Sequence, residues 1–335
     1  MTTHTPSTPT SPLLALPDDV LQRVLVGVPL DDHCTTALVC RTFRAVVTSP
    51  QFHAVRRRSG FAERGIVVVG SADSLSGSRI RIVNKSGVEV RILGPLQVDR
   101  FASTTDGTRL FFTTLCYGKG CDVVLAVDAS SRRWKRLVNM PQNHSEHCME
   151  WHGGLLYVAG GFGQNGERLN SFYAFNEATG IWEDLPPMPQ ACAWAASGVI
   201  GNQLFIACGN VGETLQIYDI ASRTWRLGAD LPDSRSRYAR GYVVDGKLCV
   251  MSVYSRDGKP VLVYDPQANT WTEEAPPPSS QARFACVHDG RLVVFQEDGT
   301  VVARATDGSW SLCADGGEPQ ESSLKRSVNE SVLLG

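Results

Sequence analysis

Five side chains that can bind a metal ion lie close together in one segment of the chain: His144, Glu146, His147, Cys148 and His152. Zinc sites are built from imidazole and thiolate ligands, but the spacing of these residues is not that of a known closed zinc set. His152 falls at the turn before an expected strand, where its side chain need not converge with the others. The segment therefore favours an ordinary loop, and we predict neither a metal ion nor any other cofactor.

A second group of residues is suited to recognition. The segment Arg235-Ser-Arg237-Tyr238-Ala-Arg240 interleaves guanidinium groups with an aromatic ring. Guanidinium groups bind carboxylates and phosphates in a bidentate manner, and aromatic and arginine side chains anchor protein interfaces. The alternative interpretation is a solvated basic loop on a protein whose net charge is close to zero.

The elements that must position these residues are β-hairpins. In Val263-Tyr-Asp-Pro-Gln-Ala-Asn-Thr-Trp271 an apolar strand leads into a polar turn, and a tryptophan opens the next strand. The pattern recurs around Trp134, Trp182 and Trp225 and, shortened, around Trp310. Successive tryptophans in this series are 48, 43, 46 and 39 residues apart. A strand-rich repeat of this length indicates a propeller or a solenoid, and the fixed position of the tryptophan predicts packing between repeats rather than ligand stacking.

Each hairpin is preceded by two further strand signals, so one repeat supplies four strands. The first repeat, near 64–97, lacks both the tryptophan and an innermost strand, whereas 329–334 is a strand without a repeat of its own. We expect this last strand to complete the first repeat and close the ring, because closure removes exposed sheet edges. The expected repeats and closing strand are 64–97, 98–140, 141–189, 190–233, 234–278, 279–316 and 328–334.

Residues 13–60 differ from the repeats because their apolar residues recur with helical spacing. A first helix begins after Leu16-Pro17-Asp18-Asp19, a second begins at Asp31 or Asp32 and ends before Ser49-Pro50, and a third covers 51–58. About 45 residues is near the lower limit for independent folding. The three helices are therefore expected to depend on a partner or on the following domain.

These helices also carry a set of spaced motifs. Leu16-Pro17-Asp18-Asp19-Val20, Leu38-Val39-Cys40-Arg41-Thr-Phe43-Arg44 and Ser49-Pro50-Gln-Phe52 resemble the F-box, specifically that of plant F-box/kelch-repeat proteins. The resemblance implies docking onto a Skp-type adaptor that bridges to a cullin scaffold. Phe43 departs from the family, which usually has tryptophan there. A plain three-helix core would need the same apolar residues. The residues expected to form the core or the adaptor contact are Leu16, Pro17, Leu21, Leu25, Leu38, Val39, Cys40 and Phe43.

The repeats resemble kelch repeats in the paired glycines Gly160-Gly161 and in the Tyr-Asp that precedes the tryptophan in later copies. The resemblance implies that the connections between blades and the loops after the glycine strand share one face, commonly the binding face. The sequence shows neither the ligand set of kelch copper-radical oxidases nor that of iron-dependent specifier proteins. The residues expected on the target-binding face are Arg235, Arg237, Tyr238, Arg240, Arg283, Trp194, His144 and Arg100.

Composition sets the remaining bounds. With 335 residues and 42% hydrophobic content, the chain can bury a large core, and its net charge of −2 predicts no nucleic-acid partner. None of the ten cysteines stands in a CxxC pair, which favours reduced, core-filling thiols and a cytoplasmic or nuclear location. Residues 1–12 are rich in Thr, Ser and Pro and are expected to be disordered. No apolar run is long enough to predict a membrane span or a secretion signal.

The sequence therefore predicts a mainly β fold, a six-bladed kelch β-propeller over 64–335, preceded by a small three-helix F-box over 13–60. The expected function is that of the substrate-recognition subunit of a Skp-cullin-F-box ubiquitin ligase, with a protein target of unknown identity and no catalysis by the chain itself. The alternatives are a propeller scaffold or enzyme-inhibitor module without a ligase role and, third, an enzyme built on the propeller.

Overall fold

The structure is a computed structural model of the whole chain. Its described residues in the N-terminal segment are 16–26, 28, 36, 38–47, 49, 51–52 and 55–56. In the remainder they are 65–71, 78–83, 89–93, 102–113, 122–128, 133–208, 213–232, 239–252, 258–278, 282–288, 290–296, 300–313 and 328–334.

Two helices of the N-terminal module have defined bounds, α1 (Asp18–Leu25) and α3 (Arg41–Val47). Leu21 and Leu25 of α1 are buried against the end of α3 and against Phe52. The second helix predicted by the sequence does not run unbroken to Val47: Cys40 is not helical, and α3 begins after it. The third predicted helix lies partly outside the described residues, although Gln51, Phe52, Val55 and Arg56 are helical.

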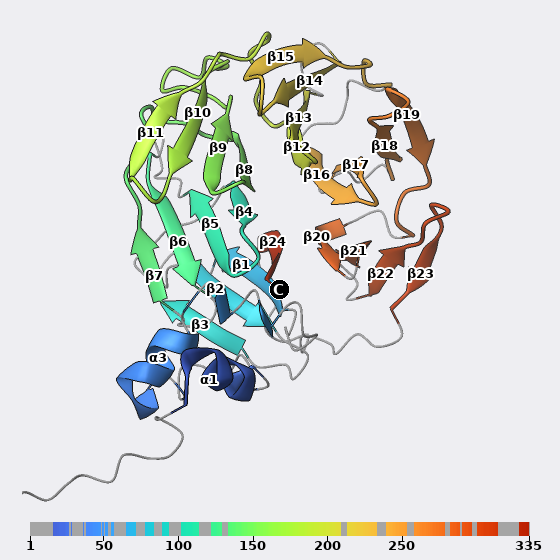
Figure 1. The fold of residues 1–335 in the computed structure, drawn as a ribbon. Helices are drawn as coiled ribbons and strands as arrows, with labels where there is room; N and C mark the ends of the chain where they lie inside the picture. Colours follow the sequence, from blue (N-terminus) through green and yellow to red (C-terminus); the bar gives the residue numbers. More distant parts are fainter. Residues whose placement is uncertain are drawn as a thin grey trace, which may run out of the picture.

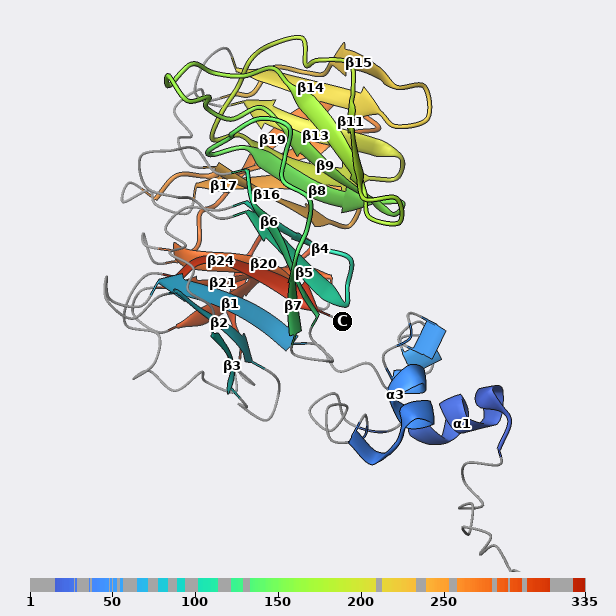
Figure 2. The ribbon, with the colours of Figure 1, turned by 90° about the vertical axis from the view of Figure 1, so that its left-hand side faces the viewer.

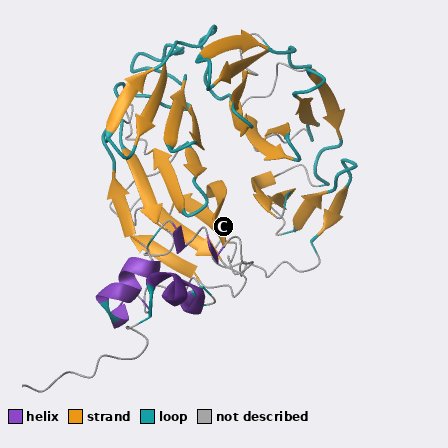
Figure 3. Cartoon of the chain, in the orientation of Figure 1, coloured by secondary structure: helices purple, strands orange, loops and turns teal. Residues whose placement is uncertain are grey.

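The rest of the described chain forms six four-stranded antiparallel sheets, which we number as blades in chain order (Figures 1 and 3). Blade 1 contains β24 (Val328–Leu334), β1 (Gly65–Ser71), β2 (Ser78–Val83) and β3 (Glu89–Leu93); blade 2 contains β4 (Ser103–Thr105), β5 (Arg109–Thr113), β6 (Val124–Asp128) and β7 (Arg133–Arg136); blade 3 contains β8 (Cys148–His152), β9 (Leu155–Ala159), β10 (Phe172–Asn176) and β11 (Ile181–Asp184).

The later blades repeat the arrangement. Blade 4 contains β12 (Ala196–Ile200), β13 (Gln203–Cys208), β14 (Thr214–Asp219) and β15 (Thr224–Leu227); blade 5 contains β16 (Ala239–Val244), β17 (Lys247–Ser252), β18 (Val261–Asp265) and β19 (Thr270–Glu274); blade 6 contains β20 (Ala282–His288), β21 (Arg291–Gln296), β22 (Val301–Arg304) and β23 (Trp310–Leu312). The mainly β propeller predicted from the sequence is confirmed.

The blades close into a ring through their innermost strands. Each innermost strand contacts the innermost strand of the next blade, and β24 contacts both β20 and β4. Strand β24 also pairs antiparallel with β1, with Val67 opposite Val332 and Gly65 opposite Leu334. Blade 1 is therefore built from both halves of the chain, since its inner strand follows the last repeat while its other three strands precede the second.

The recurring position of the tryptophan in blades 3 to 6 has a structural cause. The indole N–H of Trp225 donates to the carbonyl of Pro186 at 2.8 Å, and that of Trp271 donates to the carbonyl of Ala229 at 2.9 Å. Trp182 and Trp310 make the same bond to the chain that leaves the preceding blade. The predicted packing of tryptophan between adjacent blades is confirmed for these four residues; the side chain of Trp134 lies outside the described residues.

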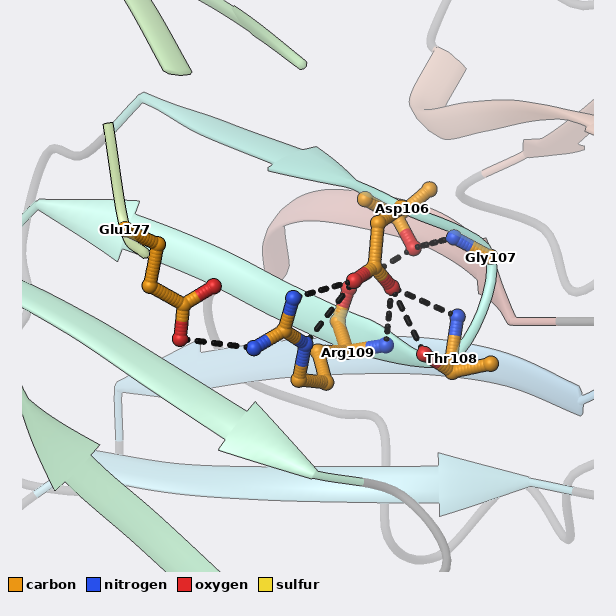
Figure 4. Close-up of polar contacts among 6 residues, drawn as sticks. Asp106, Gly107, Thr108, Arg109 and Glu177 are labelled. Atoms are coloured by element: carbon orange, nitrogen blue, oxygen red, sulfur yellow. Dashed lines mark hydrogen bonds and ion pairs between the residues drawn. The ribbon is translucent and has the colours of Figure 1, made fainter. Parts of the chain in front are cut away.

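Ion pairs add polar links between neighbouring blades. Arg109 of β5 binds Asp106 in its own blade at 2.7 Å and Glu177 of blade 3 at 2.7 Å (Figure 4). Burial alone would raise the pKa of Asp106, but the N–H groups of Thr108 and Arg109 and the Arg109 guanidinium together hold it below its ordinary value. The Arg109 guanidinium also lies 5.0 Å from the ring centre of Phe111. This contact orders the end of the blade 2 to blade 3 junction that faces away from the paired glycines.

Candidate functional site

The N-terminal module exposes apolar side chains beside a closed core. Leu38 is 75% exposed and Val39 is 67% exposed, whereas Leu21 of the core is fully buried. Val24, on α1, is 52% exposed. Exposed apolar side chains of this size are typical of a protein interface. We call the neighbouring residues Leu38 and Val39 the apolar F-box surface.

The other predicted F-box residues have structural roles. Leu25 is buried with Leu21 in the core, and Phe43 packs partly buried against it. Pro17 is exposed and opens α1, where its carbonyl accepts the N–H of Leu21 at 2.9 Å. The thiol of Cys40 accepts the N–H of Phe43 at 3.4 Å and so caps α3, while Leu16 is half-buried before α1.

Arg56 is a structural residue that the sequence did not reveal. Its side chain is only 3% exposed, and one guanidinium nitrogen donates to the carbonyl of Val26 at 2.7 Å and also to that of Val28. Carbonyl groups at the end of a helix have no partner within the helix, so Arg56 supplies donors that α1 lacks. Only its position in a run of arginines was visible in the sequence, and such runs are usually solvated.

Replacing Arg56 with alanine is expected to destabilise the F-box by about 2 to 3 kcal/mol, because buried carbonyls lose charged donors. The change should accelerate hydrogen exchange of the α1 amides in the full chain. Arg23→Ala is the matched control, since Arg23 is exposed and its ion pair with Asp19 spans 3.9 Å. Equal exchange rates in the two variants would contradict the structural role of Arg56.

The register of the sheets places two sets of loops at one end of the propeller. Cys148, the first residue of β8, lies opposite Ala159, the last residue of β9, and Ala196 likewise lies opposite Ala207 in blade 4. Blades 5 and 6 have the same arrangement. Segments that enter an innermost strand and loops that leave the second strand therefore share one end, which we call the loop face.

The chain enters the propeller at the other end. Gly65, the first residue of β1, lies opposite Leu334, the last residue of the innermost strand β24. Innermost strands begin at the loop face, so the end of β24 and the start of β1 lie on the far side. Figure 2 shows α1 and α3 on that side, near the C-terminus of the chain. The helices α1 and α3 and the loop face thus lie on opposite sides of the propeller.

Four of the eight predicted target-binding residues have described side chains or backbone positions on blades 3 to 6. Trp194 precedes β12, Arg240 is the second residue of β16, and Arg283 is the second residue of β20. All three positions lie at the loop face, as does His144. Arg100, Arg235, Arg237 and Tyr238 lie outside the described residues.

His144 was predicted to contribute to the target-binding surface, but its side chain is buried at 1% exposure. Its Nδ1 atom donates to the carbonyl of Gly160 at 2.6 Å, and its ring meets the edges of His147 and Tyr173. The assignment of His144 to the surface is therefore wrong, because the imidazole fills the space below the paired glycines. Its role is to support the loop face from inside.

His147 lies beside it in the same buried layer, where its Nε2 is 3.2 Å from the Thr113 hydroxyl. Burial lowers the pKa of His147 to about 3, and the positive fields of His144 and Arg240 act in the same direction. Burial likewise lowers the pKa of His144. Both imidazoles are therefore neutral near pH 7 and act as packed polar groups.

The loop face of blades 3 and 4 carries an aromatic pair. The rings of Phe162 and Trp194 meet edge to face with centroids 4.6 Å apart, and both side chains are half-buried. The guanidinium carbon of Arg168 lies over Phe162 at 6.0 Å from the ring centre. Arg168 was not predicted from the sequence; its only signal is its position in the loop after the paired glycines. We call Phe162, Trp194 and Arg168 the aromatic platform.

Two glycines hold the aromatic platform in place. Gly160 and Gly161 both have positive φ, and a Cβ on them would lie 2.4 Å from the Cys192 carbonyl and 2.6 Å from the Ser145 carbonyl. Only glycine permits this approach, which lets Gly161 donate to Cys192 at 2.8 Å. The paired glycines thus join the blade 3 loop to the segment that carries Trp194.

The histidine-rich segment from His144 to His152 contains residue types that can bind a metal ion. Over the described parts of the chain, no three or more His, Cys, Asp or Glu side chains are grouped so that they could hold a metal ion. The seven described cysteines are free, and five of them are buried. None of the described helices is long and apolar enough to cross a membrane.

Comparison with known proteins gives matches for both parts of the molecule. The F-box domain model matches residues 13–54, and the Kelch motif model matches residues 144–189, which hold blade 3 and the paired glycines. The solved structure of YjhT superposes with a TM-score of 0.56 at 15% identity, covering 71% of this chain and 88% of that one. This likeness concerns the fold alone.

Curated relatives show the same combination. The putative F-box/kelch-repeat protein At1g27420 of Arabidopsis thaliana is 25% identical over 64% of this chain, and the F-box/kelch-repeat protein At1g67480 of the same plant is 28% identical over 63%. The chain spans 66% and 60% of the length of these two relatives. Kelch-like protein 40 of Xenopus tropicalis is 29% identical over 34% of this chain.

The fold and both matches define a propeller protein that carries an F-box at its N-terminus. More particularly, the chain combines an F-box match with a kelch match, and this is the combination that the names of its two Arabidopsis thaliana relatives state.

Proposed function

We propose that the chain is the substrate-recognition subunit of a Skp-cullin-F-box ubiquitin ligase. Its F-box docks onto a Skp-type adaptor, the adaptor joins it to a cullin scaffold, and the propeller holds a target protein for ubiquitination. The chain performs no bond chemistry in this role. Free thiols in the described core suit a reducing compartment, which supports the cytoplasm or the nucleus as its location.

The observation that carries the proposal is the apolar F-box surface. Leu38 and Val39 lie within the segment that matches the F-box domain, residues 13–54, and both are exposed. Packing of the module's own core therefore does not explain why these two positions are apolar. Burial of such side chains in an interface contributes roughly 1.5 to 3 kcal/mol each. Two such side chains would contribute about 3 to 6 kcal/mol, which is a substantial share of the free energy of binding a protein partner.

The placement of α1 and α3 opposite the loop face supports the same function. An adaptor bound to the F-box would leave the loop face open, because the chain enters the propeller at the far end from the starts of its innermost strands. A target bound there would be tethered to the ligase and held at a high effective concentration near the conjugating enzyme.

A pull-down with the full chain and with a chain that lacks residues 1–60 tests the proposal. We expect the full chain alone to capture a purified Skp-type adaptor and, through it, a cullin. Failure of the full chain to bind the adaptor would refute the ligase role and favour the scaffold or inhibitor alternative. Capture by both chains would also refute it, because the F-box would then not be the docking element.

A further inference from the structure

We infer that the aromatic platform is the anchor for a target segment that carries an acidic group beside an apolar side chain. This inference rests on the proposed function and specifies the chemistry of the target that the loop face would hold. Trp194 and Phe162 offer an apolar contact, and Arg168 offers a guanidinium next to it. The shared chemistry of the acidic group is that of a carboxylate or a phosphate.

The platform is rigid before any target binds. Trp194 has φ of +54°, which a bulky aromatic residue rarely adopts, and its N–H donates at 3.1 Å to the carbonyl of Glu146, which also has φ of +54°. Phe162 donates to and accepts from Ser145 through backbone bonds at 2.7 and 3.1 Å. Strained residues persist where surrounding contacts hold them, and they gather at binding sites. A target therefore meets the two rings already in position.

Arg168 is exposed, and its guanidinium lies over the ring of Phe162. None of the ion pairs among the described residues involves Arg168, and the carboxylate of the adjacent Glu167 accepts the N–H of Asn165 at 2.9 Å within its own turn. A guanidinium over an aromatic face keeps its N–H groups directed outwards from the stem, where they can bind a carboxylate in a bidentate manner. The Arg168 side chain thus combines an aromatic contact with N–H groups that form no ion pair among the residues the structure describes.

The surrounding charges favour an acidic rather than a basic segment. The positive charge of Arg240 acts to lower the pKa values of His147 and Cys148, and that of Arg168 acts to lower the pKa of Cys192. Two guanidinium groups therefore lie near the buried residues under the aromatic platform. The carboxylate of Glu150, which lies in the same blade, accepts the Ser197 hydroxyl at 2.7 Å. His144 and His147 are neutral near pH 7 because burial lowers the pKa of each. An incoming acidic group therefore meets positive charge beside the apolar rings.

The test is a selection of phage-displayed random peptides on the purified full-length chain, followed by affinity measurements with synthetic peptides. We expect selected peptides to hold Asp or Glu within a few positions of an aromatic or aliphatic residue. Arg168→Glu should weaken their binding at least tenfold, and Arg168→Lys should weaken it less because the charge is kept while the planar fork is lost. Arg291→Glu is the matched control: Arg291 is exposed and starts β21 at the end away from the loop face.

Each outcome decides a separate question. Replacing the acidic residue of a selected peptide with its amide should cost the wild-type chain about as much affinity as Arg168→Glu does, and a phosphoserine peptide tested beside it distinguishes phosphate from carboxylate. Selected peptides without acidic residues, or unchanged binding in Arg168→Glu, would overturn the inference. Adaptor capture by Arg168→Glu should equal that of the wild type. Acid-dependent peptide binding by a chain that captures no adaptor would refute the ligase role alone.

Discussion

A chain that lacks residues 328–335 is expected to lose at least about 5 kcal/mol of propeller stability. Strand β24 pairs along β1, and each lost backbone hydrogen bond removes roughly 0.5 to 1.5 kcal/mol. The truncation also opens the ring, since β24 contacts β20 and β4, and it exposes the edge of β1. Thermal unfolding followed by far-ultraviolet circular dichroism measures the loss.

Two controls separate ring opening from general damage. Removing residues 1–12 shortens the chain by a comparable length and should leave the unfolding temperature unchanged. A synthetic peptide of residues 326–335, added to the truncated chain, should restore stability by occupying the vacant place beside β1. An unfolding temperature equal to that of the full chain would show that β24 does not close the ring.

Substituting both Leu38 and Val39 with glutamate is expected to weaken adaptor binding about 100-fold or more. The two side chains are 75% and 67% exposed, so their burial in an interface contributes about 3 kcal/mol at least, and a charge placed there adds a desolvation cost. A loss of about 3 kcal/mol of binding free energy corresponds to a dissociation constant that is roughly 100-fold larger. Isothermal titration with a purified Skp-type adaptor provides the measurement.

The same exposure makes this variant a clean test. Leu38 and Val39 lie outside the buried core of the F-box, so the melting temperature of the double variant should match that of the wild type. Val138→Glu serves as the control, because Val138 is a half-exposed apolar residue on the propeller. Wild-type affinity in the double variant would place the adaptor contact elsewhere.

The propeller could be predicted from the sequence because the pattern that indicates it is local and repeated. The hairpin around Trp271 contains within nine residues the apolar strand, the turn and the indole that define β18 and β19. The indole N–H bond to Ala229 adds a physical reason for the period, since blades 3 to 6 each make the same link to the chain that leaves the preceding blade. A tryptophan that recurs after the same kind of strand and turn can be recognised in a single sequence, without an alignment.

The site residues were harder to predict because their roles depend on contacts distant in sequence. The sequence predicted both Leu21 and Leu38 as residues of the core or the adaptor contact, but only the packing of α1 against α3 shows that Leu21 is buried and Leu38 is exposed. His144 was predicted to lie on the target-binding face, but its imidazole is buried and donates to the carbonyl of Gly160. Arg168 gained its significance from Phe162 and from a tryptophan of the next connection. Neither the charge nor the periodicity of the sequence indicates these contacts between residues that are distant in the chain.

The pairing of β1 with β24 has a consequence for synthesis of the protein on the ribosome. Strand β1 emerges early, but its inner neighbour is translated only after every other blade, so the nascent propeller stays open until then. The F-box precedes β1 and is complete long before. Under the proposed function, a prematurely terminated product would occupy the adaptor through Leu38 and Val39 without a closed ring. Such a fragment would compete with intact receptors instead of being merely inactive.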